Sequence, residues 1–227
     1  MNANALAADR AAALKLVSVS RETLDRIDAF VELFLRWQRA VQLVAPADLP
    51  KLWTRHIADS LQLIELAPAA KRWADLGTGG GFPGLVIALA FGAREKGFVH
   101  LIESDQRKAA FLREVIRLTG APAKVYAERV ESAAKQLASE VDVVTARALA
   151  PMPRLLELAA PFFAKGIPAL FPKGQDVDNE LTEATKSWNI QTTIVPSRTH
   201  PHGKIVIVER ASPRIGNSQA SEAGKHP

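Results

Sequence analysis

Residues 72–84 read RWADLGTGGGFPG, and this stretch decides the fold class. A short apolar run at 72–76 predicts a buried strand, and the apolar residues at 83–91 predict a helix. The glycines between them let the backbone adopt positive φ and let a ligand approach the main chain closely. Gly79, Gly81 and Gly84 match the spacing of the dinucleotide-binding fingerprint, although that motif alone is weak. The stretch therefore predicts the first strand, loop and helix of an α/β ligand-binding sheet.

The chain beyond this loop alternates strands and helices. Further strands are predicted at 98–103, 123–127, 141–146, 167–171, 190–196 and 204–209, with helices at 104–118, 152–164 and 176–188. This alternation predicts a mainly parallel, seven-stranded sheet. The last two predicted strands have no helix between them, so the final strand is expected to be antiparallel.

The predicted organisation has four parts. Residues 1–19 form a flexible N-terminal tail, and residues 20–70 form a helical extension with helices at 20–40 and 52–66 that packs on the sheet. Residues 71–210 form the α/β domain. Residues 211–227, rich in Ser, Gly, Pro and Asn, are expected to be disordered.

Composition excludes several functional classes. The 227 residues are 48% apolar and 23% charged, as in soluble globular domains, and contain no cysteine. The absence of cysteine excludes disulfides, thiolate metal sites and cysteine nucleophiles. The five histidines form no metal motif, so no metal site is expected, although His200 and His202 could hold a stray ion.

The net charge bears on the kind of partner the protein could bind, and the hydropathy bears on whether it enters a membrane. The net charge of +5 is compatible with a polyanionic partner, but it is equally that of an ordinary solvated surface. No uncharged apolar stretch is long enough to span a membrane, and the N-terminus lacks the order of a signal peptide. A cytoplasmic monomer with no membrane association is expected.

Two carboxylates near the glycine loop point to the type of cofactor. Asp75 lies two residues before Gly77, where its charge would repel the pyrophosphate of NAD. Glu103 ends the second predicted strand, where it could accept hydrogen bonds from two ribose hydroxyls or simply cap the next helix. An acidic loop entrance with an acidic ribose ligand suits S-adenosylmethionine, which is cationic and lacks phosphate. An NAD-dependent oxidoreductase stays open as an alternative.

Five motifs occur in one order along the chain. They are residues 53–61 (WTRHIADSL), 75–84 (DLGTGGGFPG), 128–131 (ERVE), 145–149 (TARAL) and 171–174 (FPKG). Together they resemble the bacterial ribosomal RNA small subunit methyltransferase G family, also called glucose-inhibited division protein B, over about residues 20–210. Only residues 42–44 (Gln-Leu-Val) depart from the Asn-Leu-Thr that is common in the family, which puts that Asn's contact in doubt.

The resemblance implies a class I S-adenosylmethionine-dependent enzyme with a Rossmann-like fold. It further implies methylation at N7 of a guanine in the 530-loop region of 16S ribosomal RNA, on the 30S subunit or an assembly intermediate. The cofactor contacts that the resemblance implies are Gly77, Phe82, Val130, Glu131 and Arg147. Asp75, Gly79, Gly81 and Glu103 are added because of their positions in or near the glycine loop and at the strand end.

Substrate residues are weaker candidates, each with an ordinary structural alternative. Arg147 could clamp the cofactor or nucleotide or form a surface ion pair, and Lys173 could meet a phosphate or guanine O6 or be a solvated lysine. Arg55, His56, Asp59 and Ser60 share one helical stretch, which could contact substrate or cofactor or could be a polar network that fixes the N-terminal helices to the sheet. His202 and Lys204 could line the RNA-binding face or belong to an ordinary loop before the last strand.

Guanine N7 carries a free in-plane lone pair, so a methyltransferase acting on it needs positioning and no general base. A small-molecule methyltransferase and a ribosome-binding module with a vestigial pocket remain open.

Overall fold

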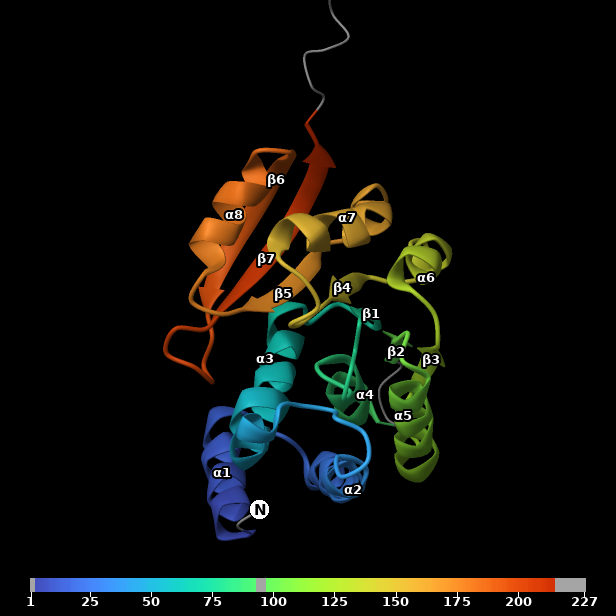
Figure 1. Ribbon diagram of the computed structural model, residues 1–227, viewed down its shortest axis with the longest axis vertical. Helices are drawn as coiled ribbons and strands as arrows, with labels where there is room; N and C mark the ends of the chain where they lie inside the picture. The colour runs from blue at the N-terminus through green and yellow to red at the C-terminus, as the bar shows by residue number, and fades with distance from the viewer. Residues whose placement is uncertain (1–2, 93–96, 215–227) are drawn as a thin grey trace, which may run out of the picture.

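The computed structural model describes residues 3–92 and 97–214, and its centre is one seven-stranded sheet (Figure 1). The strand order is β3-β2-β1-β4-β5-β7-β6. Neighbouring strands from β3 to β5 are parallel, whereas β7 is antiparallel to both β5 and β6. The strands are β1 (Arg72–Leu76), β2 (Phe98–Ile102), β3 (Ala123–Tyr126), β4 (Val143–Thr145), β5 (Ala169–Lys173), β6 (Trp188–Pro196) and β7 (Lys204–Pro213). The predicted sheet with its antiparallel last strand is confirmed.

Helices cover both faces of the sheet (Figure 1). One apolar core joins the sheet to α1 (Ala3–Leu16), α2 (Arg21–Trp37), α3 (Asp59–Leu66), α4 (Gly84–Phe91) and α5 (Gln106–Thr119). A second core on the opposite face includes α6 (Val130–Leu137), α7 (Met152–Phe163) and α8 (Val177–Thr185). Alternate residues of β1 supply the two cores, Trp73 the first and Ala74 the second. This period of two is what a strand buried on both faces requires.

The predicted flexible tail at residues 1–19 is wrong, because α1 spans Ala3–Leu16 and packs on the helical segment that follows α2. Ala13 is 1% exposed, and the Asp9 carboxylate accepts hydrogen bonds from the Trp53 amide at 2.8 Å and the Thr54 hydroxyl at 2.6 Å. Arg10 pairs with Asp28 of α2 at 2.7 Å. These contacts with distant residues fix a helix that has little amphipathic pattern of its own.

The single helix expected at 52–66 has two parts, with a 3₁₀ segment before it. The 3₁₀ turn η1 covers Pro46–Lys51, a π-helical segment η2 covers Trp53–Ala58, and α3 follows. π-Helical segments are frequent at functional sites. Here the segment carries His56, whose role is described below.

Other features also differ from the sequence-based predictions. Helix α5 begins later than the predicted residue 104, because Asp105 caps it by accepting from the Arg107 and Lys108 amides. Helix α6 was not predicted. Strand β7 continues to Pro213, so residues 211–213 are not disordered as predicted. The rest of the tail predicted to be disordered, from residue 215, lies outside the described residues.

Candidate active site

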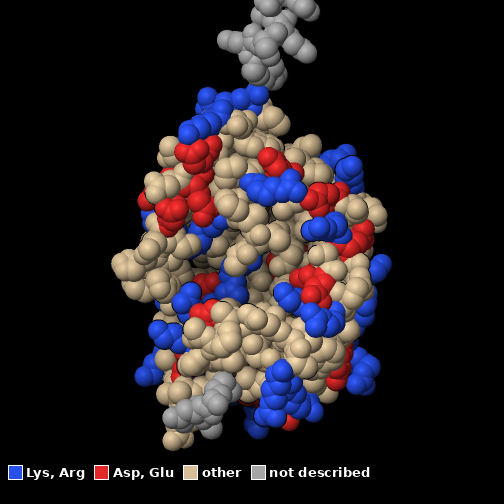
Figure 2. Space-filling model, viewed as in Figure 1, with Lys and Arg blue, Asp and Glu red and all other residues tan. Residues whose placement is uncertain are grey.

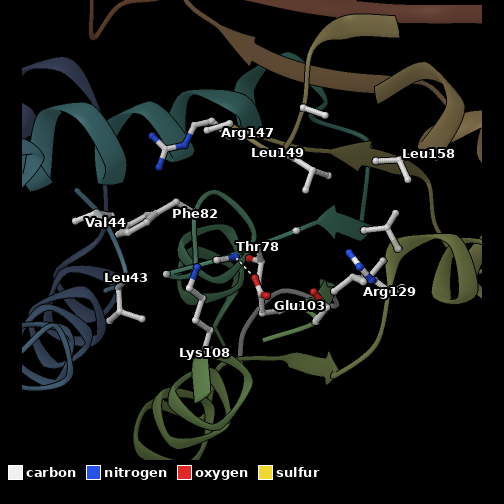
Figure 3. Close-up of a pocket in the computed structure, with 18 of the residues that line it drawn as sticks. Leu43, Val44, Thr78, Phe82, Glu103, Lys108, Arg129, Arg147, Leu149 and Leu158 are labelled. Atoms are coloured by element: carbon white, nitrogen blue, oxygen red, sulfur yellow. Dashed lines mark hydrogen bonds between the residues drawn. The ribbon is translucent and has the colours of Figure 1, made fainter. Parts of the chain in front are cut away.

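A cavity of about 570 Å³ lies at the carboxyl ends of β1, β2 and β4 (Figure 3). Its size is that of a typical small-molecule site. Phe82, Leu43 and Val44 lie on one side, Glu103 and Lys108 on another, and Leu149 and Leu158 face them. The position is the ligand-binding edge that the strand order predicts for an open α/β sheet.

The glycine loop needs its glycines for two separate reasons. Gly77, Gly79 and Gly81 have φ values of +68°, +56° and +98°, which disfavour any side chain. A Cβ on Gly77 would lie 2.5 Å from Leu149 Cδ1, whereas the nearest atom to a Cβ on Gly79 is 3.9 Å away. Gly77 is thus constrained by packing and conformation, and Gly79 by conformation and by the cavity that it lines.

Glu103 joins the glycine loop to the end of β2. Its Oε2 accepts from the Gly79 amide at 2.9 Å and its Oε1 from the Asp105 amide at 2.8 Å (dashed for Gly79 in Figure 3). The residue is 8% exposed and lines the cavity. Since each carboxylate oxygen can accept more than one hydrogen bond, Glu103 keeps acceptor capacity for ligand hydroxyls. The ligand-acceptor interpretation fits this geometry, whereas the alternative that Glu103 caps the next helix is wrong, because Asp105 caps α5 and Glu103 binds the amide of Asp105.

Asp75 was predicted to contact the cofactor, but it lies in the protein interior and not at the cavity surface. It is fully buried, does not line the cavity, and accepts from the Gly84 amide at the start of α4 at 2.8 Å. Burial raises the pKa of Asp75 to about 6, partly offset by the Thr78 hydroxyl and the Gly84 amide. Asp75 therefore acts on the site by fixing the glycine loop to α4.

Arg147, two residues after the end of β4, lies between this cavity and a second one of about 650 Å³. Its Nη1 donates to the Arg55 carbonyl at 2.7 Å, its Nη2 donates to His56 Nδ1, and Asp59 Oδ2 lies 3.6 Å away. Burial lowers the pKa of Arg147, with Asp59 and Asp75 opposing the shift. The next residue, Ala148, has φ of +52°, an unusual conformation for a side-chain-bearing residue and a mark of functional loops.

His56 is neutral in this setting. Burial, together with the nearby Arg147 and Arg55 cations, lowers its pKa to about 3. Because Nδ1 accepts from Arg147, the hydrogen-bond pattern assigns the ring proton to Nε2. The ring lies 4.9 Å from that of Phe82, centroid to centroid. His56 is thus a fixed acceptor for Arg147, not a base that titrates near neutral pH.

The remaining predicted residues divide between the two cavities and the interior. Val130 and Glu131 line the first cavity, and Arg55 and Lys173 line the second. Gly81, Ser60 and His202 line neither; Ser60 is buried and its hydroxyl donates to the His56 carbonyl at 2.6 Å.

Lys173 is not the solvated lysine of the alternative interpretation. Its side chain is 10% exposed and its ammonium bonds Glu180 and the Ala150 carbonyl.

Several cavity residues were missed by sequence reasoning. Lys108 and Arg129 line the first cavity, and His200 lines the second. Two sequence candidates do take part: Asp59 contacts Arg147, and Lys204 lines the second cavity. Figure 2 shows basic and acidic side chains interspersed around the hollow on this face. The signal that could have found Lys108 and Arg129 is their place shortly after strand ends, near Glu103 and the 128–131 motif.

Across the described residues, no group of three or more His, Asp and Glu side chains is placed to hold a metal ion. The same residues include no helix with the length and apolar character of a membrane span.

A family model for rRNA small subunit methyltransferase G (GidB) matches residues 23–208. The chain belongs to this family. A relative from Bradyrhizobium sp. (strain ORS 278), named ribosomal RNA small subunit methyltransferase G, is 53% identical, covering 91% of this chain and 93% of its own. A relative of the same name from Rhodopseudomonas palustris (strain BisB18) is 52% identical over 92% of this chain and 89% of its own.

Solved structures share the family's fold at low identity. An O-methyltransferase from Bacillus cereus in complex with SAH has a TM-score of 0.58 at 15% identity, covering 89% of this chain and 97% of its own. Cofactor-bound Rv0187 from MTB also has a TM-score of 0.58 at 15% identity, covering 92% and 99%. These likenesses establish the methyltransferase fold.

The segment that departs from the family's common pattern borders the first cavity. Leu43 and Val44 line it, and Gln38 holds the segment by accepting from both of their amides, at 2.9 and 3.1 Å. Gln42 itself is exposed and lines neither cavity. The position of the replaced Asn is therefore next to, and not within, the cavity wall.

Proposed function

We propose that this protein methylates N7 of a guanine in the 530-loop region of 16S ribosomal RNA, with S-adenosylmethionine as methyl donor. The observation that carries the proposal is Arg147, a partly buried cation shared by two adjoining cavities in a chain of the methyltransferase G family. We further propose that it acts in the cytoplasm as a monomer, on the small subunit or its assembly intermediate.

The first cavity suits the cofactor. Gly77 and Gly79 leave room for close backbone approach, and Glu103 offers acceptors for ribose hydroxyls. Val130 beside Leu158 supplies apolar wall for an adenine, while Glu131 adds negative charge near a cationic ligand. When bound, S-adenosylmethionine supplies an electrophilic methyl group on its sulfonium. Phe82 would contribute to the cavity wall, and Asp75 would support the loop from the interior.

The second cavity suits a nucleotide of an anionic partner. Arg55, Lys173, His200 and Lys204 line it, and it adjoins the first cavity through the wall formed by Arg147 and residues 148–150. Arg55 and Lys204 are partly exposed cations whose partners, Asp48 and Asp178, are also surface carboxylates. Such pairs exchange readily with phosphates, because exposed ion pairs are weak.

The chain's residues can support methylation at N7 without removing a proton. N7 of guanine is an in-plane acceptor that is unprotonated at neutral pH, so the requirement is alignment. Arg147 is fixed by the Arg55 carbonyl, His56 and Asp59, and is thereby placed to hold the base or the cofactor. His56, with its pKa of about 3, offers no base near neutrality.

Small ribosomal subunits reconstituted with 7-deazaguanosine at the target test this proposal. Methyl transfer from labelled S-adenosylmethionine is expected with the guanosine subunits and not with the 7-deaza subunits, because the accepting atom is gone. Transfer to the analogue at the normal rate would contradict N7 as the acceptor. No transfer to either subunit or to naked 16S RNA, together with transfer to a small molecule, would favour the small-molecule alternative.

A further inference from the structure

We infer that Asp59 and Gln62 of α3 are positioning residues that hold the wall of the second cavity in shape for the target nucleotide. The inference rests on the proposed function. Neither residue belongs to the cofactor cavity, and both reach across to the connection between β6 and β7, residues 197–203.

Asp59 links three parts of the chain that are far apart in sequence. Its Oδ1 accepts from the Thr199 hydroxyl at 2.7 Å, the Ser197 hydroxyl at 3.3 Å and the Gln62 amide at 2.8 Å. Its Oδ2 faces Arg147 at 3.6 Å. One carboxylate thus binds the 197–203 connection on one side and the shared cation on the other.

Gln62 completes the attachment. It is 2% exposed, its Nε2 donates to the Ser197 hydroxyl at 3.1 Å, and its Oε1 accepts from the Arg198 amide at 3.0 Å. Burial makes loss of these bonds costly, since the polar groups left behind have little access to water. Asp59 and Gln62, one helical turn apart, hold residues 197–199 against α3.

These contacts bear on the second cavity directly. Asp59, Ser197, Thr199 and Arg147 all line it. The 197–203 connection is otherwise a short turn, with bonds from the Ser197 amide to the Gly203 carbonyl at 2.9 Å and from the Gly203 amide to the His200 carbonyl at 3.0 Å. Its orientation over the cavity therefore depends on α3. Small misplacements of positioning groups reduce rates strongly, which gives this attachment a role in turnover.

The structure separates the two functions of Asp59 into testable parts. Asp59→Asn keeps an acceptor oxygen for Thr199 but removes the charge that faces Arg147. Gln62→Ala and Thr199→Val release the connection but leave that ion pair intact. The first variant is expected to act mainly on kcat, and the other two mainly on KM for RNA.

Matched controls exist away from the cavities. Asp28→Asn removes a carboxylate that pairs with Arg10 at 2.7 Å, and Gln191→Ala removes an amide that donates to Glu209 at 2.8 Å. Neither residue lines either cavity. These variants show how kcat, KM and the melting temperature change when a polar contact outside the two cavities is lost.

The experiment measures kcat and KM with small subunits, the affinity for S-adenosylhomocysteine by calorimetry, and the melting temperature. We expect Asp59→Asn to lower kcat by about 10- to 100-fold. We expect Gln62→Ala and Thr199→Val to raise KM for RNA about tenfold, with the S-adenosylhomocysteine Kd within about threefold of wild type in all three variants.

Kinetics equal to those of the controls in folded variants would overturn the inference. If Asp59→Asn does not fold, Thr199→Val decides, because it removes one hydroxyl contact at nearly constant volume; unchanged KM there overturns the inference as well. Wild-type protein that transfers no methyl group to ribosomal RNA would instead contradict the proposed function, so the two failures are distinguishable.

Discussion

The guanidinium of Arg147 lies against the ring of Phe82, with Cζ 5.4 Å from the ring centroid. Phe82 follows the glycine loop directly and is 4% exposed, packed edge to face on Phe30 of α2 at 5.6 Å. Cation–π contacts of this kind contribute about 0.5–2 kcal/mol. The segment after β4 and the loop after β1 are therefore joined through one aromatic ring, which couples the shared wall of the two cavities to the glycine loop.

Arg147→Ala is expected to lower kcat/KM by about 100-fold, since the variant loses a fixed cation between the two cavities. Arg147→Lys should recover only part of this, because lysine cannot reproduce the planar contacts with His56 and the Arg55 carbonyl. Methyl-transfer kinetics check the prediction, with Arg72→Ala as control for an arginine–aspartate pair away from the cavities. Activity equal to that control would contradict it.

Glu103→Gln is expected to weaken S-adenosylmethionine binding by about 1.5–3 kcal/mol, the range for a hydrogen bond to a charged group. The substitution also places an NH₂ group against the Gly79 or Asp105 amide, which removes one of the two bonds that hold the loop. Calorimetry measures the change. Glu114→Gln, which touches Trp37 and neither cavity, is the control, and the same affinity in both variants would remove Glu103 from the cofactor site.

Gly79→Val is expected to abolish cofactor binding while the protein still folds, because the new side chain enters the cavity that Gly79 lines. Gly120→Val is the matched control: its φ of +65° is close to the +56° of Gly79, and a Cβ at Gly120 would meet nothing within 4 Å. Both variants should lose about 1 kcal/mol or more of stability to backbone strain. Only Gly79→Val should lose cofactor binding. Equal cofactor binding in the two variants would show that the glycine loop is a structural turn and not part of the cofactor site.

The pH dependence of stability tests the setting of Asp75. Burial raises its pKa from 3.8 to about 6, so the folded state holds more protons than the unfolded state between those values. The stability that Asp75 contributes should fall by about 3 kcal/mol in total as pH rises from well below 4 to well above 6. Urea unfolding gives the free energy of unfolding of wild type and Asp75→Asn at each pH, and the difference between the two isolates Asp75. The opposite pH effect of His56 is present in both proteins and therefore cancels. Parallel profiles would show that Asp75 is not held in this way.

Lys173→Met tests whether the lysine meets RNA. It should lower stability by about 1–3 kcal/mol, because Glu180 loses its partner although it still accepts from the Met152 amide. The slope of log K for RNA against log salt should flatten by about one unit if the ammonium exchanges Glu180 for a phosphate. A lower melting temperature with an unchanged slope would assign Lys173 to the fold alone.

Much of the sheet could be predicted because its signals are local. Strand β1 has the predicted bounds, since a buried apolar run ends at glycines that the loop requires. The predicted start of the helix at residue 20 holds, because Ser20 caps α2 by accepting from the Thr23 amide. Helix α1 could not be predicted in the same way, because the contacts of Asp9 that fix it involve residues 44 and 45 positions away.

The site shows the same division. The position of Glu103 in the cavity wall could be predicted, because the end of a strand is visible in the sequence. Asp75 was placed at the cavity surface, because sequence cannot tell which face of β1 an acidic residue occupies at the strand's end; its side chain faces α4. Asp59 could be named as a candidate from its helical stretch, but its contacts could not be predicted, because its partners in the 197–203 connection are up to 140 positions away.

The reversed direction of β7 has a consequence for how members of such a family diverge. Since β6 ends and β7 begins at the same edge of the sheet, the hairpin tip between them starts and finishes beside the second cavity. A wholly parallel sheet would need a crossover to bring chain back to that edge. Insertions or substitutions in the tip leave both apolar cores and the glycine loop untouched. Target choice can therefore evolve on this one hairpin while the methyl-donor half of the protein stays constant.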